Sequence, residues 1–328
     1  MSALTPQAVT GAVVLVILAI LPAWVFNSYY INIASQILLW AVLALALNVL
    51  VGWAGLTSLG HAGLFAVGGY AAALLLGHGW GHLAADLAAI AITLAATAVF
   101  AGLALRATGI GFLMITLAIG QILWGVAYRW VSLTNGDNGV NVPTRPAPFG
   151  ISLTDAGPFY LASLMVFLGA VASMIVFARS PFGAALRGTR DQARRMTALG
   201  YNVWLIRFLA FLFSGFWSGV AGVLFCYYNQ FVSPGVLSLG SSAEALLMVI
   251  SGGTGTLFGP IVGAALVVAM KNVASAYIER WNFVLGAIFV AIVIFMPEGL
   301  VPGCTRLWRW SWAALGASRR TAIGETSR

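Results

Sequence analysis

An apolar stretch near the N-terminal end contains a histidine and several small residues whose chemistry matters. Residues 48–73 read NVLVGWAGLTSLGHAGLFAVGGYAAA, with six glycines among them. We expect His61 to have a structural or gating role there, hydrogen-bonded to nearby backbone or to Ser58 rather than titrating. Glycines let two backbones approach closely, so the stretch is either a crowded helix interface or one wall of a path through the molecule. The path residues would be Thr57, Ser58, His61, Gly68 and Gly69.

A second glycine-rich interruption lies in the other half of the chain. Residues 244–265 read EALLMVISGGTGTLFGPIVGAA and place Gly252, Gly253 and Gly255 between two short apolar halves. We expect a broken or re-entrant helix here, with these three glycines also on the path, because non-helical backbone at membrane depth must be covered by protein or line a cavity. Glu244 is either a helix-start carboxylate favoured by the helix dipole or a group that distinguishes an ammonium from an anion.

Six arginines crowd the segment 179–207, in which Asp191 is the one acidic residue. The pattern predicts one or two short amphipathic helices that end at Gly200. Such a helix either docks into a groove of a partner protein or lies on lipid headgroups, its arginines serving only to orient the chain. The docking candidates are Arg187, Arg190, Asp191, Arg194, Arg195, Ala198 and Gly200.

Membrane-spanning helices are the elements that must position these residues. Of the 328 residues, 61% are hydrophobic and 7% are charged, and the mean hydropathy is +0.98, whereas soluble domains carry about a quarter charged residues. The apolar runs are near the ~20 residues that a helix needs to cross a bilayer, and they lack the strict alternation of barrel strands. We therefore predict an all-α polytopic membrane protein.

The order of the apolar runs predicts about eight transmembrane helices plus the re-entrant one. The basic segment 179–207 is placed in the cytoplasm because Lys and Arg gather on that side, and alternation from there leaves both termini cytoplasmic and 130–158 outside. Residues 1–316 then form one transmembrane domain, and the polar tail 317–328 is expected to be disordered. The expected spans are 10–26, 31–51, 56–76, 84–105, 110–130, 157–178 and 208–228, followed by the interrupted 244–270 and by 282–296.

Several function classes are excluded by what the sequence lacks. The net charge of +8 reflects membrane topology and does not indicate nucleic-acid binding. No GxxxxGK[ST] loop, paired carboxylates or Ser/His/Asp arrangement is present, so we expect no enzyme, and any ATP must be hydrolysed by another chain. Cys226 and Cys304 have no metal-binding spacing, so we expect neither a disulfide nor a metal site.

Four separated motifs occur in a recognisable order and spacing. They are GWAGLTSLGHAGLFAVGGYAAALL, LTNGDNGV, SPFGAALRGTRDQARRMTALGYNV and LLMVISGGTGTLFGPIVGAAL. Together they closely resemble the LivM-type permease subunits of the branched-chain amino acid ABC transporter family. The resemblance covers about residues 33–303, and the similar permeases for urea and short amides leave that cargo open.

The resemblance implies a subunit of an importer in the bacterial inner membrane. A second homologous permease would pair with this chain, two cytoplasmic ATPase subunits would use ATP and Mg, and a periplasmic solute-binding protein would deliver the cargo. The chain itself would bind no cofactor. Residues 187–200 look like the coupling loop, with Ala198 and Gly200 matching its signature, although Arg195 and Met196 stand where an acidic residue is usual.

Two rival classes stay open on the residues alone. An ion-coupled secondary transporter is suggested by the two interrupted helices, although such proteins commonly hold intramembrane acidic relays. A passive channel would also suit a glycine-rich re-entrant element. On the favoured interpretation, ATP-driven movement of 179–207 tilts the helices beside the glycine-rich segments and opens a path between them.

Overall fold

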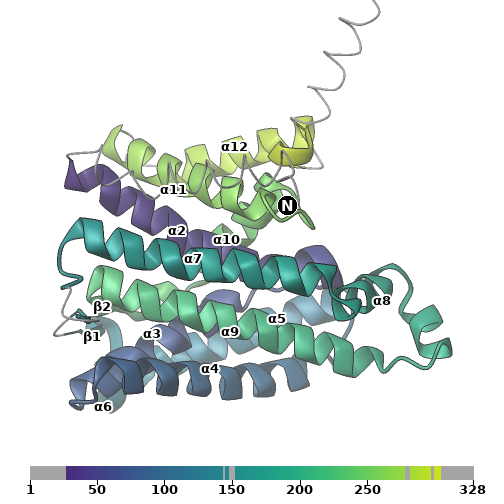
Figure 1. The fold of residues 1–328 in the computed structure, drawn as a ribbon, viewed down its shortest axis with the longest axis horizontal. Coiled ribbons are helices and arrows are strands. Elements are labelled where there is room, and N and C mark those ends of the chain that lie inside the picture. Colours follow the sequence, from purple (N-terminus) through teal and green to yellow (C-terminus); the bar gives the residue numbers. More distant parts are fainter. Residues whose placement is uncertain (1–26, 143–144, 148–151, 278–280, 297–298, 304–328) are drawn as a thin grey trace, which may run out of the picture.

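The computed structural model describes residues 27–142, 145–147, 152–277, 281–296 and 299–303. Within these ranges the chain is mostly helical, and its long helices lie roughly side by side (Figure 1). The expected span 10–26 and the tail 317–328 lie outside the described residues. The elements are α2 (Ser28–Asn48), the π-helical turn η1 (Val49–Ala54), α3 (His61–Gly77), α4 (His82–Ala104), α5 (Ile110–Arg129), α6 (Val131–Thr134), the 3₁₀ turn η2 (Gly136–Asn138), β1 (Val140–Asn141), α7 (Ala156–Arg179), α8 (Pro181–Ala198), α9 (Val203–Asn229), β2 (Phe231–Val232), the 3₁₀ turn η4 (Pro234–Leu237), α10 (Leu239–Gly252), α11 (Gly259–Tyr277) and α12 (Trp281–Phe295).

The bundle has two distinct ends. Helix α8 projects from one of them, at the right of Figure 1, and the short strands β1 and β2 lie at the other. We call these the α8 end and the sheet end. The strands pair antiparallel, with Val140 opposite Val232; they are two residues each and leave the described chain mostly helical, as the sequence predicted. They form where two non-helical connections meet, because buried backbone groups need hydrogen-bond partners.

Five helices in the described part of the chain are long and apolar enough to cross a membrane. They are Ser28–Ala54, which joins α2 and η1, and the helices α4, α5, α7 and α9. The expected spans from 31–51 through 157–178 match these helices closely, except for 56–76. Helix α9 begins at Val203 rather than at residue 208, because the Asn202 side chain accepts a hydrogen bond from the Leu205 N–H at 3.0 Å and caps the helix earlier.

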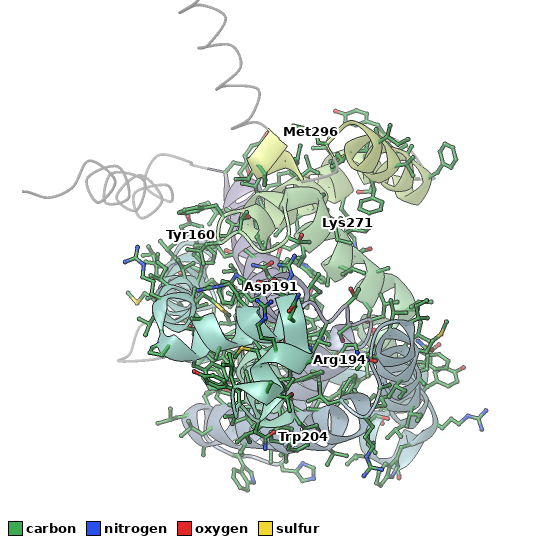
Figure 2. All side chains as sticks on the ribbon, turned by 90° about the vertical axis from the view of Figure 1, so that its right-hand side faces the viewer. Tyr160, Asp191, Arg194, Trp204, Lys271 and Met296 are labelled. Carbon is green, nitrogen blue, oxygen red and sulfur yellow. The ribbon has the colours of Figure 1, made fainter. Side chains whose placement is uncertain are left out.

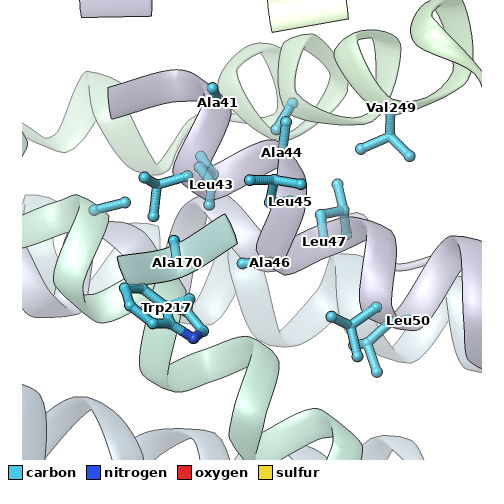
Figure 3. Packing of buried hydrophobic residues seen from close by; sticks show 14 of the residues in the cluster. Ala41, Leu43, Ala44, Leu45, Ala46, Leu47, Leu50, Ala170, Trp217 and Val249 are labelled. Carbon is cyan, nitrogen blue, oxygen red and sulfur yellow. The ribbon is translucent and has the colours of Figure 1, made fainter. Parts of the chain in front are cut away.

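Helix α2 is the centre of the bundle. Residues 38–50 are all buried, and α2 packs against α7, α9, α10 and α11. Figure 3 shows Leu43, Ala44 and Leu47 of α2 among Ala170, Trp217 and Val249 from the surrounding helices. A helix that is apolar on all sides belongs in a protein interior or a membrane, and this one is covered by protein.

Helices α10 and α11 form an antiparallel hairpin that meets α2 on one face. The backbones nearly touch at the turn, where a Cβ on Gly252 would collide with the Gly259 carbonyl. Farther along, Lys271 Nζ of α11 lies 3.2 Å from Glu244 Oε2 of α10. The expected interruption of 244–270 is therefore confirmed, and α12 then follows close to the expected span 282–296.

Candidate functional site

The first glycine-rich stretch contains a true break between two helices. The π-helical turn η1 ends at Ala54 and is capped by Gly55, whose φ of +68° lies in the left-handed region that glycine tolerates. The Leu56 N–H still reaches back to the Leu50 carbonyl at 2.8 Å. Helix α3 begins only at His61, which corrects the expected start at residue 56.

His61 lies at this break in a closed set of hydrogen bonds. It is 1% exposed, its Nδ1 lies 2.8 Å from Ser58 Oγ, and its Nε2 lies 2.9 Å from Ser214 Oγ of α9. The Ser214 hydroxyl donates to the Ala46 carbonyl at 2.6 Å, so its oxygen must accept from the imidazole. A neutral His61 with its proton on Nε2 satisfies both serines, as the expected structural role requires.

Helices α4 and α5 close the same break from another side. Thr116 Oγ1 of α5 accepts a hydrogen bond from the Leu59 N–H at 3.2 Å. A Cβ on Gly60 would collide with the ring of Phe100 on α4 and with the Thr116 carbonyl. Thr57 is partly buried and Ser58 is fully buried. The break is thus packed inside protein, one of the two settings that non-helical backbone requires at membrane depth.

Gly68 and Gly69 lie where α3 crosses α9. A Cβ on Gly68 would lie 2.6 Å from the Gly219 carbonyl oxygen, and one on Gly69 would lie 3.1 Å from that of Gly222. Both residues of α3 are buried. Small residues let helices approach this closely, so this geometry supports the crowded-interface interpretation for these two positions.

The second break lies beside the first, and a side chain of α2 joins them. Asn48 Nδ2 donates to the Thr256 carbonyl at 2.8 Å, and Asn48 Oδ1 accepts from the Gly255 N–H at 2.9 Å. Trp53 Nε1 donates to the Gly255 carbonyl at 3.1 Å. Gly252, Gly253 and Gly255 were predicted to line the path, whereas Asn48 was not predicted to have a role. A polar asparagine within an otherwise apolar run is the feature of the sequence that could have indicated one.

The basic segment has the form that the sequence predicted. Helix α8 bends at Gln192, whose φ of −150° and ψ of 89° are not helical, and it stops before Gly200, whose φ is +87°. Beyond the bend, Arg194, Arg195 and Ala198 are exposed. Figure 2 looks onto this end of the molecule, with Asp191 and Arg194 in front of the bundle.

Apolar side chains stand beside these charges at the α8 end. Leu199 is 66% exposed, and Tyr201 and Trp204 are also exposed. We call residues 193–204, most of which are exposed, the α8 tip. Closer to the bundle, Arg187 donates to the Ala178 carbonyl at 3.0 Å, and Arg190 donates to the Gly52 carbonyl. A projecting surface that mixes arginines with exposed large apolar groups is typical of a protein interface.

Two acidic side chains within the helices have close partners. Glu244 forms the ion pair with Lys271. Asp86 of α4 accepts a hydrogen bond from the Tyr227 hydroxyl at 2.6 Å. Among the described residues, no three of His, Cys, Asp and Glu gather closely enough to hold a metal ion.

An arginine holds the connection between α5 and α7 against the sheet end. Arg145 donates to the carbonyls of Tyr227 and Tyr228 at 2.9 Å each, and also to those of Leu153 and Thr154. Burial lowers the pKa of its guanidinium, and the four carbonyl dipoles compensate part of that cost. Arg145 therefore attaches its part of the connection to the end of α9.

An apolar cavity of about 620 Å³ opens near the sheet end, between α3, α4, α5, α6 and η4. Ala71, Leu74, Leu123 and Leu133 are part of its wall. Tyr70 also lines it, and its hydroxyl is buried with no hydrogen-bond partner. An unpaired buried hydroxyl is costly. The lining is mostly apolar, and His78 and Thr134 also contribute to it.

Comparison with known proteins agrees with this arrangement. Residues 29–293 match the family model described as "Branched-chain amino acid transport system / permease component". The chain belongs to this family. It is 30% identical to the high-affinity branched-chain amino acid transport system permease protein LivM of Salmonella typhimurium, over 87% of this chain and 73% of the relative. No solved structure matches it.

Two further relatives bear on assembly. LivM of Escherichia coli is 30% identical over 88% of this chain and 74% of the relative. LivH of Escherichia coli, a second permease protein of the same system by its name, is 24% identical over 80% of this chain and 91% of the relative. The chain is therefore a multi-pass membrane permease whose family includes two different permease proteins of one transport system.

Proposed function

We propose that this chain is a permease subunit of an ABC importer that moves branched-chain or related amino acids across the bacterial inner membrane. The main support for this proposal is that residues 29–293 match the permease family. The named relatives act in branched-chain amino acid transport, which favours that cargo over urea or short amides.

The partners follow from the two kinds of relative and from the α8 tip. A LivH-like permease would form the second half of the translocation unit. The α8 tip, with Arg194, Arg195 and Leu199 exposed, would dock on one of two cytoplasmic ATPase subunits, which hold ATP and Mg. A periplasmic binding protein would deliver cargo at the sheet end.

The same assignment orients the chain. With the α8 tip in the cytoplasm by the positive-inside rule, the sheet end faces the periplasm and both termini are cytoplasmic. Helices α10 and α11 form the re-entrant element in this proposal: the hairpin enters and leaves on the sheet-end side, and its turn points toward the α8 end beside Gly52. The proposed topology is eight spanning helices plus this hairpin within residues 1–316.

The partnered acids weigh against an ion-coupled carrier. Glu244 is paired with Lys271 and Asp86 is bonded to Tyr227, so neither is poised as a free proton or cation site. The cavity at the sheet end instead has an apolar wall suited to an aliphatic side chain. We therefore place it on the cargo path.

Uptake by cells tests the proposal directly. Radiolabelled leucine, isoleucine, valine and urea are supplied to a deletion strain carrying either wild type or the double variant Arg194→Glu, Arg195→Glu. We expect leucine-type uptake to vanish in the deletion and to fall about tenfold in the double variant, because reversed charges oppose the interface. Arg106→Glu, at an exposed arginine that lies outside the tip on the same end, is the control and should behave as wild type.

Each alternative has its own signature in this experiment. Loss of urea uptake alone would change the cargo and keep the architecture. Uptake that persists after ATP depletion would favour a secondary carrier or a channel. Equal loss in Arg106→Glu would mean that general charge at this end matters, and the α8 tip would not be the docking surface.

A further inference from the structure

Three segments at helix ends meet beneath α8: the π-helical turn η1, the α10–α11 turn and the segment after α12. A Cβ on Gly52 of η1 would collide with the backbone nitrogen of Gly255, between α10 and α11. A Cβ on Gly299, in the segment after α12, would collide with the Cα of Gly253. Because Gly52, Gly253, Gly255 and Gly299 make contact through backbone atoms, any shift in one piece is felt directly by its neighbour. We call this group the glycine junction.

Side chains of α2 and η1 hold two sides of the junction together. The two hydrogen bonds of Asn48 and the one from Trp53 all end on the backbone of Gly255 or Thr256. All three hydrogen bonds are partly buried, and leaving such a polar group unpaired costs stability. The α10–α11 turn is therefore attached to the end of the central helix and does not move independently of it.

One side chain of α8 reaches the junction. Arg190 Nη1 donates to the Gly52 carbonyl, and the Arg190 stem covers Gly55, where a Cβ would lie 2.8 Å from Arg190 Cγ. A Cβ on Gly255 would lie 3.6 Å from the same Nη1. Arg187, one turn earlier, donates instead to Ala178 at the end of α7.

The position of Arg190 within α8 suits it to pass on a movement. It stands two residues before the bend at Gln192, so it lies where the exposed tip joins the half of α8 that packs on the bundle. A guanidinium at the carbonyl end of a helix is favoured by the helix dipole and forms a charge-assisted hydrogen bond. A displaced tip would thus pull on Gly52 and, through it, on Gly255.

We propose that Arg190 is the positioning residue that links movement of the α8 tip to the two helix breaks during transport. The inference rests on the proposed function, in which the tip docks on an ATPase. It adds that the linkage runs through one side chain onto the Gly52 carbonyl, and that the α10–α11 turn and the end of α2 respond together. Arg190 itself need not touch the cargo.

The test uses the whole transporter in proteoliposomes, with its partner permease, ATPase subunits and binding protein. The quantity measured is cargo taken up per ATP hydrolysed, for wild type, Arg190→Gln, Arg190→Lys and the control Arg194→Gln. We expect Arg190→Gln to lower this ratio about tenfold, since a charge-assisted hydrogen bond is lost, while ATP hydrolysis continues. Arg190→Lys keeps the positive charge and should restore part of the ratio.

Arg194→Gln changes an exposed arginine of the tip, so it should lower hydrolysis and uptake together and leave their ratio unchanged. An unchanged ratio in Arg190→Gln overturns the linkage, whether its uptake is normal or falls in step with hydrolysis. If Arg190→Gln fails to assemble, Arg190→Met, which also lacks a charged donor, decides, and a wild-type ratio there overturns the inference. Wild-type vesicles without ATP-dependent uptake would instead refute the proposed function.

Discussion

His61 shows how one polar side chain is accommodated at a helix break inside an apolar bundle. Burying a polar group without a hydrogen bond is costly, and here both ring nitrogens have a serine partner, Ser58 from the break itself and Ser214 from α9. Ser214 also donates to Ala46 of the central helix. The imidazole therefore fixes the start of α3 relative to α9 and α2.

Ser214→Ala tests this at the level of a single hydroxyl. The substitution leaves the His61 Nε2–H without its partner in a fully buried site, so we expect a loss of about 1–3 kcal/mol of stability. Thermal unfolding of the purified protein in detergent, followed by its melting temperature, measures the change. Equal melting temperatures for Ser214→Ala and wild type would contradict this role.

Ser218→Ala is the matched control for Ser214→Ala. Ser218 is equally buried on α9, but its hydroxyl donates to the Ser214 carbonyl one turn earlier. That carbonyl also accepts the ordinary helical hydrogen bond, so the extra one adds little. We expect a clearly smaller change than for Ser214→Ala.

Among the elements, α9 is a helix that α3 and α4 both approach closely. Its glycines Gly215, Gly219 and Gly222 leave room for Thr97 and Thr93 of α4 and for the backbone of α3. Ser214 of the same helix bonds to His61 at the first break. Helix α9 is thus the element against which both the first break and the α3 crossing are positioned.

Gly68→Ala separates the two interpretations of the first glycine-rich stretch. Its Cβ would lie 2.6 Å from the Gly219 carbonyl oxygen, so α3 must move away from α9, at a cost of about 1–3 kcal/mol. Gly77→Ala on the same helix meets no atom within 4 Å and is the control. We expect less monodisperse protein after heating for Gly68→Ala alone, measured by size-exclusion chromatography. Reduced uptake with unchanged stability would favour the path interpretation instead.

The sequence was sufficient to locate the helix breaks but not their partners. Glycine runs predict where a helix stops, because glycine destabilises helix and adopts left-handed backbone, and both breaks lie where GWAGLTSLGH and SGGTGT stand. The contact of Asn48 with Thr256 joins residues 208 positions apart. No local pattern encodes such a contact, because it depends on how α2 and the α10–α11 hairpin pack.

The same distinction holds for the α8 segment and the central helix. The arginine-rich pattern predicted one or two short helices ending at Gly200, and α8 has that form, with a bend at Gln192. The identity of the buried central helix was not predictable, since α2 and α7 are similarly apolar and only packing decides which is enclosed. The two-residue strands were missed because they are too short to produce a period.

At the scale of the whole molecule, the two ends of the bundle have different chemistry. Exposed arginines gather on the α8 tip, whereas the sheet end holds the apolar cavity with the unpartnered Tyr70 hydroxyl. The buried central helix α2 extends toward the α8 end, where it meets the glycine junction. This separation is consistent with the proposed function, in which an ATPase docks at the α8 end and an aliphatic cargo enters at the sheet end.

Filling the cavity tests whether it belongs to the cargo path. Ala71 lines the cavity from α3 and is buried, so in Ala71→Trp the indole would occupy space that an aliphatic side chain needs. We expect leucine uptake to fall at least about tenfold, a loss equivalent to about 1.4 kcal/mol, while ATP hydrolysis by the assembled transporter persists. Ala95→Trp, at an exposed position of α4, adds the same ring outside the cavity and should transport as wild type. Normal uptake by Ala71→Trp would remove the cavity from the path, whereas equal loss in both variants would show that the added ring disturbs the bundle in general.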